Sequence, residues 1–154
     1  MIIKKIGPYF LGQDFNTATD LKEFSDIEYS LFEDKGVFRR LDDERFFHGK
    51  DLTLIELPWD TVVSCTQGKI YKIVLQQYMT EKKNSNWVFQ KMLEFLTEQI
   101  GKHTEHAFFS KRYIWDAPEG NLILMQGKNI YVGAPTIHVV YVFITASFIR
   151  EQRT

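Results

Sequence analysis

The chain has little cysteine: Cys65 is the single one among its 154 residues. A lone cysteine forms no intramolecular disulfide, and disulfide frameworks are the mark of small secreted domains. Cys65 follows the apolar residues Val62 and Val63, a setting typical of a small side chain in a buried strand. The sequence therefore favours a reducing compartment, and we expect a cytoplasmic protein.

Long hydrophobic runs and a large net charge are also missing. The longest apolar candidate, Val139–Ile149, is shorter than the ~20 residues that a membrane-spanning helix needs. Residues 1–12 lack the uninterrupted apolar core and the cleavage site of a signal peptide. The formal net charge is -1, from 19 basic and 20 acidic side chains, which provides no global attraction for nucleic acid or an anionic membrane. We expect neither as a partner.

Sequence motifs of catalysis and cofactor binding are absent. The nine glycines are scattered and form neither a Walker loop nor a dinucleotide-binding fingerprint. Ser64 and Cys65 lie outside any G-x-S-x-G nucleophile elbow, and the acidic run Asp42–Glu44 falls in a predicted turn. We therefore predict no catalytic residue and no cofactor, and we favour a protein that is not an enzyme.

His103, Glu105 and His106 supply side-chain types found in zinc and nickel sites. The remaining histidines, His48 and His138, are distant in sequence, and the spacing matches no established metal motif. A cation after a helix C-terminus is favoured by the helix dipole, which gives His103 a structural role. We therefore expect no bound metal.

Aromatic residues are abundant. They make up 15% of the chain, with 13 Phe and 7 Tyr, within a hydrophobic fraction of 44%. A chain of this length buries a core of its own without disulfides or metals. We predict one domain over residues 1–154, in which 151–154 form a frayed tail. The segments that follow Trp59-Asp60 and Trp115-Asp116 share a weak sequence similarity. We interpret this similarity as chance and not as an internal repeat.

The segment Asn84–Gly101 predicts a long amphipathic helix. Its apolar residues recur at spacings of three and four, which places them on one side of a helix. Asn84 or Ser85 is the expected N-cap, and Gly101 is expected to end the helix. Trp87 flanks the apolar stripe, and we expect it to widen that stripe against a sheet. The stripe consists of Phe89, Met92, Leu93, Leu96 and Ile100.

Strand-like sequence lies on both sides of this helix. Short β-prone segments between turn formers indicate an antiparallel meander, and Ala117–Gly120 predicts a tight hairpin turn. Lys69–Met79 and His138–Ile149 are apolar on both faces, so each needs cover on both sides of the sheet. Thr17–Phe24 is a candidate for a short N-terminal helix. Further predicted strands are Ile27–Glu33, Gly36–Leu41, Glu44–His48, Leu52–Leu57, Thr61–Thr66, His106–Asp116 and Asn121–Gln126, with a break at Pro58–Asp60.

These elements predict an α+β fold. We expect a curved, largely antiparallel sheet of six or more strands, with the helix Asn84–Gly101 packed on one face. Such a scaffold suits both ligand pockets and protein docking, so the fold class does not choose a function.

Aromatic residues at strand ends are the candidate binding residues. Trp59 and Trp115 each precede an aspartate near a proline, where an indole either caps the core or projects into a groove. With Tyr113, Asp116 and His138 they are our candidates for contact with a ligand or partner. We favour a non-catalytic binding or protein-interaction protein. The alternative is a small-ligand carrier or an enzyme, with an aromatic pocket between helix and sheet for an apolar or planar ligand.

Overall fold

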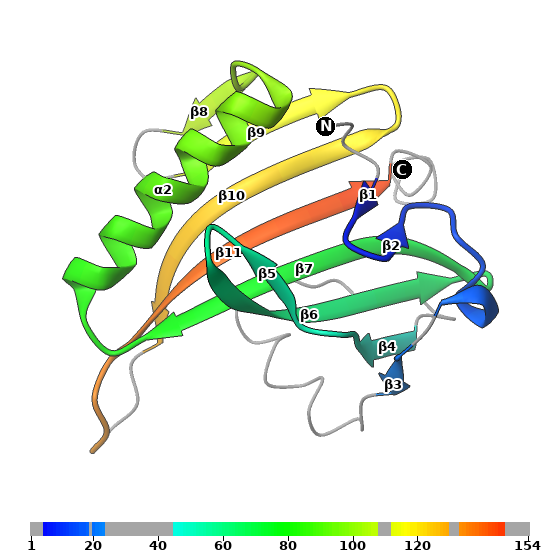
Figure 1. The fold of residues 1–154 in the computed structure, drawn as a ribbon, viewed down its shortest axis with the longest axis horizontal. Coiled ribbons are helices and arrows are strands. Elements are labelled where there is room, and N and C mark those ends of the chain that lie inside the picture. The colour runs from blue at the N-terminus through cyan, green and yellow to red at the C-terminus, as the bar shows by residue number, and fades with distance from the viewer. Residues whose placement is uncertain (1–4, 19, 24–44, 108–111, 130–132, 147–154) are drawn as a thin grey trace.

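An open, curved antiparallel sheet with a long helix on one face forms the protein (Figure 1). The computed structural model describes residues 5–18, 20–23, 45–107, 112–129 and 133–146. Neighbouring strands of this sheet are antiparallel throughout the described residues, which confirms the predicted α+β class. In spatial order the strands are β3 (Lys22–Glu23), β4 (Arg45–His48), β6 (Leu57–Thr66), β7 (Lys69–Met79), β11 (Ile137–Ala146), β10 (Gly120–Asn129), β9 (Arg112–Ala117) and β8 (Glu105–Ala107), and β5 (Leu52–Leu54) pairs with β6 beside this path.

The helix α2 (Lys82–Ile100) packs on the sheet through the predicted apolar stripe. Phe89, Met92 and Leu96 are buried, together with Val88, and the helix contacts β7, β10 and β11. Fully burying one side chain of this size contributes about 1.5–3 kcal/mol, so the stripe holds the helix against the sheet with several times that free energy.

The helix begins before the predicted caps, at Lys82. Asn84 lies within the first turn, and Ser85 is buried inside the helix, where its hydroxyl oxygen accepts a hydrogen bond from Gln126 Nε2 over 2.8 Å. Ser85 therefore serves a contact with a distant strand and does not start the helix. Gly101 ends the helix as predicted, with a φ of 113° that glycine adopts readily.

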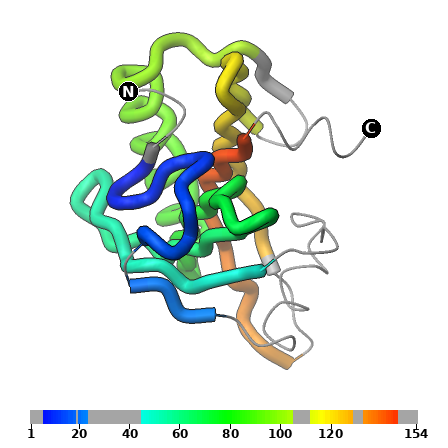
Figure 2. Tube along the Cα trace, turned by 90° about the vertical axis from the view of Figure 1, so that its right-hand side faces the viewer, coloured from blue at the N-terminus to red at the C-terminus, as the bar shows by residue number. Residues whose placement is uncertain are grey.

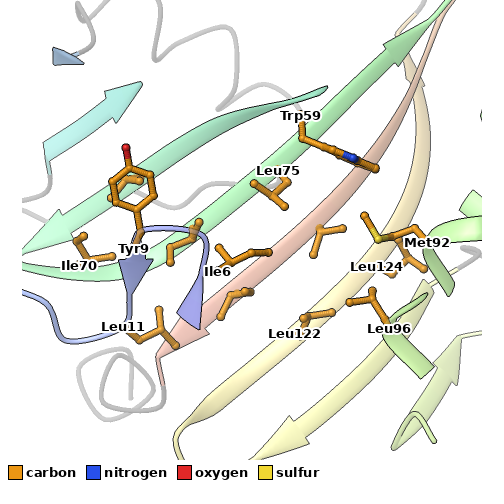
Figure 3. Packing of buried hydrophobic residues seen from close by; sticks show 14 of the residues in the cluster. Ile6, Tyr9, Leu11, Trp59, Ile70, Leu75, Met92, Leu96, Leu122 and Leu124 are labelled. Carbon is orange, nitrogen blue, oxygen red and sulfur yellow. The ribbon is translucent and has the colours of Figure 1, made fainter. Parts of the chain in front are cut away.

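Side-chain alternation gives the sheet two buried faces, which we call the helix face and the far face. On the helix face, Met92 of α2 lies close to Leu124 of β10 (Figure 3). Strands β7 and β11 have buried residues on both faces, which confirms the prediction that each is covered on two sides. The hairpin of β9 and β10 at Ala117–Gly120 is also confirmed. The far-face cluster contains Phe46, Val62, Val74, Val139, Tyr141 and Phe143.

A separate hairpin of β1 (Lys5–Ile6) and β2 (Tyr9–Phe10) adds to the cover of the helix face (Figure 2). Tyr9 is fully buried, and its hydroxyl oxygen accepts a hydrogen bond from the Lys50 N–H over 2.8 Å. A Cβ at Gly49 would come within 2.9 Å of the Tyr9 ring, so glycine at this position makes room for the ring. Burial of the Tyr9 phenol raises its pKa above the ordinary value.

Helical structure near the N-terminus differs from the prediction. The described residues there contain a 3-10 turn, η1 (Phe15–Thr17). Ala18 is extended and Asp20 has a φ of 61°, conformations that interrupt a helix. The helix predicted over Thr17–Phe24 is therefore wrong, and strand β3 takes its place.

The predicted break at Pro58–Asp60 is also wrong, because these residues belong to β6. Pro58 pairs with Thr53 of β5, and the ladder between β6 and β7 begins only at Asp60. A proline at this point removes no hydrogen bond from that ladder. The predicted strands Ile27–Glu33 and Gly36–Leu41 lie outside the described residues.

The turn between β5 and β6 carries backbone strain. Ile55 and Glu56 have φ values of 49° and 62°, between the paired residues Leu54 and Leu57. This is the geometry of a type I′ turn, which prefers Asn-Gly because a Cβ is disfavoured in the left-handed conformation. The turn Gln67–Gly68 between β6 and β7 has glycine at its second position and avoids that cost there.

Glu56→Gly should therefore raise the free energy of unfolding by about 1 kcal/mol, because glycine removes the left-handed penalty. Glu56 is exposed, so little packing is lost. Urea unfolding followed by circular dichroism measures the change. The matched control is Thr53→Gly at an exposed position of β5, which should lower stability by about 0.5–1 kcal/mol. A loss of stability in both variants would contradict the strain at Glu56.

Candidate functional site

Trp59, a predicted binding residue, is part of the core. It is fully buried on β6, in the same cluster as Leu75 and Met92 (Figure 3). Its indole Nε1 donates a hydrogen bond to Leu54 O over 3.1 Å, which ties β6 to the preceding strand. A buried indole N–H needs such an acceptor. The ring of Trp59 is thus packed in the core, and its N–H group has a hydrogen-bond acceptor within the protein.

Tyr113 and Trp115 lie together on the helix face of β9. Trp115 is buried, and its Nε1 donates a hydrogen bond to Gly101 O over 2.9 Å. The His103 ring meets both residues edge-on, with centroid distances of 4.8 Å to Tyr113 and 6.2 Å to Trp115. The Tyr113 ring also lies 5.9 Å from that of Phe89. This aromatic cluster fastens the C-terminal end of α2 to the sheet.

The other predicted residues lie apart from this cluster. Asp116 is exposed on the far face of β9, and its backbone N–H donates a hydrogen bond to Thr104 Oγ1 over 2.9 Å. His138 is half-buried on β11, and Trp59 lies on β6, on the other side of β7. The structure therefore brings two of the five predicted residues together and leaves the rest on separate strands.

Sequence reasoning missed the exposed tryptophan of the helix. Trp87 was expected to widen the apolar stripe of α2, but it lies on the solvent side with 53% of its surface exposed. Other large apolar residues with exposed surface in the described part of the chain are Phe10 and Tyr78, each at 39%. Lys83, Trp87 and Lys91 recur at intervals of four, and this spacing is the sequence signal that places Trp87 on a polar side of the helix.

Positive charge surrounds Trp87. Lys91 Nζ lies 5.9 Å from the centroid of the Trp87 ring and 3.7 Å from Glu94 Oε2. Lys82 and Lys83 occupy the first turn of α2. A helix N-terminus already carries a partial positive charge, so lysines are electrostatically unfavourable there. We call the exposed residues Lys82, Lys83, Trp87 and Lys91 the Trp87 surface.

A second group of charges consists of His48, Asp51 and Asp60. The loss of surrounding water raises the pKa of the Asp60 carboxyl above its usual value. The negative charge of Asp51 raises this pKa further, and His48 opposes the shift. The group therefore links stability to pH through desolvation and repulsion between carboxylates.

Comparisons of the chain with protein-family models, with curated proteins and with solved structures give no match. In the part of the chain that the structure describes, no helix is long and apolar enough to cross a membrane. The same residues contain no group of three His, Cys, Asp or Glu side chains placed to hold a metal ion. The case for a function therefore depends on the side chains of the molecule itself.

Asp60→Asn should stabilise the protein at neutral pH and lose this advantage in acid. The folded-state pKa of Asp60 is raised, so the folded protein binds the proton more tightly than the unfolded chain does. The contribution of Asp60 to the free energy of unfolding is complete below the pKa that its carboxyl has in the unfolded chain. This contribution is lost as the pH rises through the pKa of the carboxyl in the folded protein. Thermal unfolding of both proteins from acid to neutral pH measures the difference.

Asp51→Asn tests the raised pKa of Asp60 by removing a neighbouring negative charge. It removes a charge that raises the pKa of Asp60, so it should shift the stability profile in the same direction and by less. An Asp60→Asn variant that is less stable than the wild type at neutral pH would contradict the raised pKa.

Proposed function

We propose that the protein is a non-catalytic, cytoplasmic protein-interaction protein whose partner docks on the Trp87 surface. The observation that carries the proposal is the exposed indole of Trp87 on a rigid helix. Burying an aromatic side chain removes roughly 150–250 Å² from water, and tryptophan is enriched among the residues that dominate interface affinity. A tryptophan held in this way offers a preformed anchor for a partner. The chain's single cysteine, Cys65, is buried and has no second cysteine to form a disulfide with, which supports a cytoplasmic setting.

The contrast with the other tryptophans supports this role. Trp59 and Trp115 are buried, and each donates its indole N–H to a backbone carbonyl. Trp87 leaves more than half of its surface in water, at 53%, and contacts the Lys91 ammonium. Folding therefore gains little from the Trp87 ring, and binding a partner would gain more.

The charges of the Trp87 surface favour an acidic partner segment. Lys82 and Lys83 add positive charge at the positive end of the helix dipole. An acidic segment would offset this unfavourable arrangement and would be steered towards it before contact. We expect such a segment to place an apolar side chain on the Trp87 ring and carboxylates near the lysines.

The alternative function is a small-ligand carrier or an enzyme with a pocket between helix and sheet. Side chains of α2 and β10 meet at this interface, where Met92, Leu96, Leu122 and Leu124 are all buried (Figure 3). Close packing of this kind supports a structural use of the interface. The ligand-binding alternative stays a prediction, and a small molecule retained by the purified protein at this interface would favour it.

Trp87→Ala should weaken partner binding by at least about 30-fold, the loss typical of an interface anchor. Full-length tagged protein is used to isolate partners from its source cells, with quantitative mass spectrometry of wild type and variant. Affinity for each purified partner is then measured by calorimetry. Phe10→Ala, which removes another exposed aromatic residue, is the matched control and should bind as the wild type does.

Charge reversal provides the second arm of this test. Lys83→Glu and Lys91→Glu should each reduce the association rate and make it less sensitive to salt, because electrostatic steering is lost. If the Trp87→Ala variant isolates the same partners in the same amounts as the wild type, docking at this surface is contradicted. If the association rate of the lysine variants depends on salt as much as that of the wild type, the prediction of an acidic partner segment is contradicted. That result would not contradict docking at the Trp87 surface.

A further inference from the structure

Exposed residues at the start of β6 carry two carboxylates on either side of a proline. In β6 the buried Trp59 separates the exposed residues Pro58 and Asp60, and the exposed Glu56 precedes the strand. We call Glu56, Pro58 and Asp60 the Pro58 segment. Strand residues rise about 3.3 Å each, so its two acidic residues lie roughly 13 Å apart along the chain, with the proline midway.

The Trp87 surface has the same layout with the opposite charge. Lys83, Trp87 and Lys91 follow one another at intervals of four residues on α2, and all three are exposed. Helix residues rise about 1.5 Å each, so the two lysines lie roughly 12 Å apart along the helix axis, with the indole midway. The Trp87 surface therefore complements the Pro58 segment in charge and in spacing.

The acidic residues of the Pro58 segment have no basic partner. In the part of the chain that the structure describes, neither Glu56 nor Asp60 forms a salt bridge with a lysine or arginine. Loss of surrounding water and the negative charge of Asp51 both raise the pKa of the Asp60 carboxyl. An approaching cation would relieve the repulsion between these carboxylates. The Pro58 segment is therefore suited to the lysines of another molecule.

Backbone strain at Glu56 is the second, independent observation. Ile55 and Glu56 have φ values of 49° and 62°, in the left-handed region that glycine adopts without cost. Strained backbone of this kind persists where the surrounding structure enforces it, and it clusters at functional sites. A carboxylate at a position where glycine would be more stable indicates a use beyond folding.

We propose that the Pro58 segment of one molecule docks on the Trp87 surface of a second copy of this chain. Pro58 would lie against the Trp87 ring, and the two carboxylates would pair with Lys83 and Lys91. The docking rests on the proposed function, because it makes the acidic partner segment part of the chain itself.

The two surfaces face away from each other, so the association is head-to-tail. Pro58 and Asp60 lie on the side of β6 opposite the buried Trp59, which belongs to the helix-face cluster. Trp87 lies on the outer side of α2, which covers the helix face. A molecule docked through its Pro58 segment therefore leaves its own Trp87 surface open to a third copy.

Sedimentation velocity of the full-length protein over a concentration series tests the docking. The wild type should associate as its concentration rises, and salt should weaken this association. Trp87→Ala should lower the association constant at least about 30-fold. Lys128→Glu, a charge reversal at an exposed lysine of β10, is the matched control and should associate as the wild type does.

An exchange of charges tests which two surfaces meet. One variant combines Glu56→Lys with Asp60→Lys, and circular dichroism checks that it is folded. The second variant combines Lys83→Glu with Lys91→Glu and is checked in the same way. Each variant alone should associate at least about tenfold more weakly than the wild type, because like charges face each other. An equimolar mixture should associate to within about threefold of the wild type, because every contact between the two variants again joins opposite charges.

Nuclear magnetic resonance of the wild type provides a test without substitutions. Dilution should shift the signals of the Trp87 indole N–H and of the Asp60 backbone N–H. A wild type that stays monomeric, or a mixture of the two folded variants that does not associate, would overturn docking between copies. The proposed function would still stand if Trp87→Ala loses the partners that the wild type isolates from cells. Retention of those partners by Trp87→Ala would overturn the proposed function as well.

Discussion

Burial of β7 and β11 on both faces is the physical requirement on which the rest of the structure depends. Hydrophobic stabilisation grows with the apolar area removed from water, so a strand that is apolar on two sides needs two covering layers. On the helix face the cover comes from α2, together with the N-terminal hairpin of β1 and β2. The helix follows β7 directly in the chain and packs back on β7, β10 and β11, so the connection itself supplies the cover.

Local patterns in the sequence predicted the elements whose structure depends on neighbours in the chain. Lys69–Met79 matches β7 because its two-sided apolar character follows from alternation alone. The stripe of α2 follows from helical spacing in the same way. Pro58–Asp60 was misjudged because the role of Pro58 depends on which strands pair beside it. Ser85 was misjudged because its hydrogen-bond partner, Gln126, lies on a distant strand.

The three tryptophans show why the candidate site was harder to predict than the fold. In sequence, Trp59 and Trp115 suit either a cap over the core or a groove, with the core cap favoured, since each precedes an aspartate near a proline. Their indole N–H groups find acceptors at Leu54 O and Gly101 O, contacts that depend on tertiary structure. For Trp87 the signal was present, because the lysines four residues before and after it indicate a polar side of the helix. Hydrophobicity alone had assigned it to the apolar stripe.

The far face raises a different energetic question. An apolar residue at position 72 would extend the cluster of Val62 and Val74, and replacing buried charges with apolar side chains is often neutral or stabilising. Lys72 and Ser64 are nonetheless buried on this face, and the Tyr71 ring 5.6 Å from the Lys72 Nζ offsets part of the cost of removing the ammonium from water. The far face therefore contributes less hydrophobic stabilisation than the helix face, whose cluster holds most of the buried apolar side chains of the described residues.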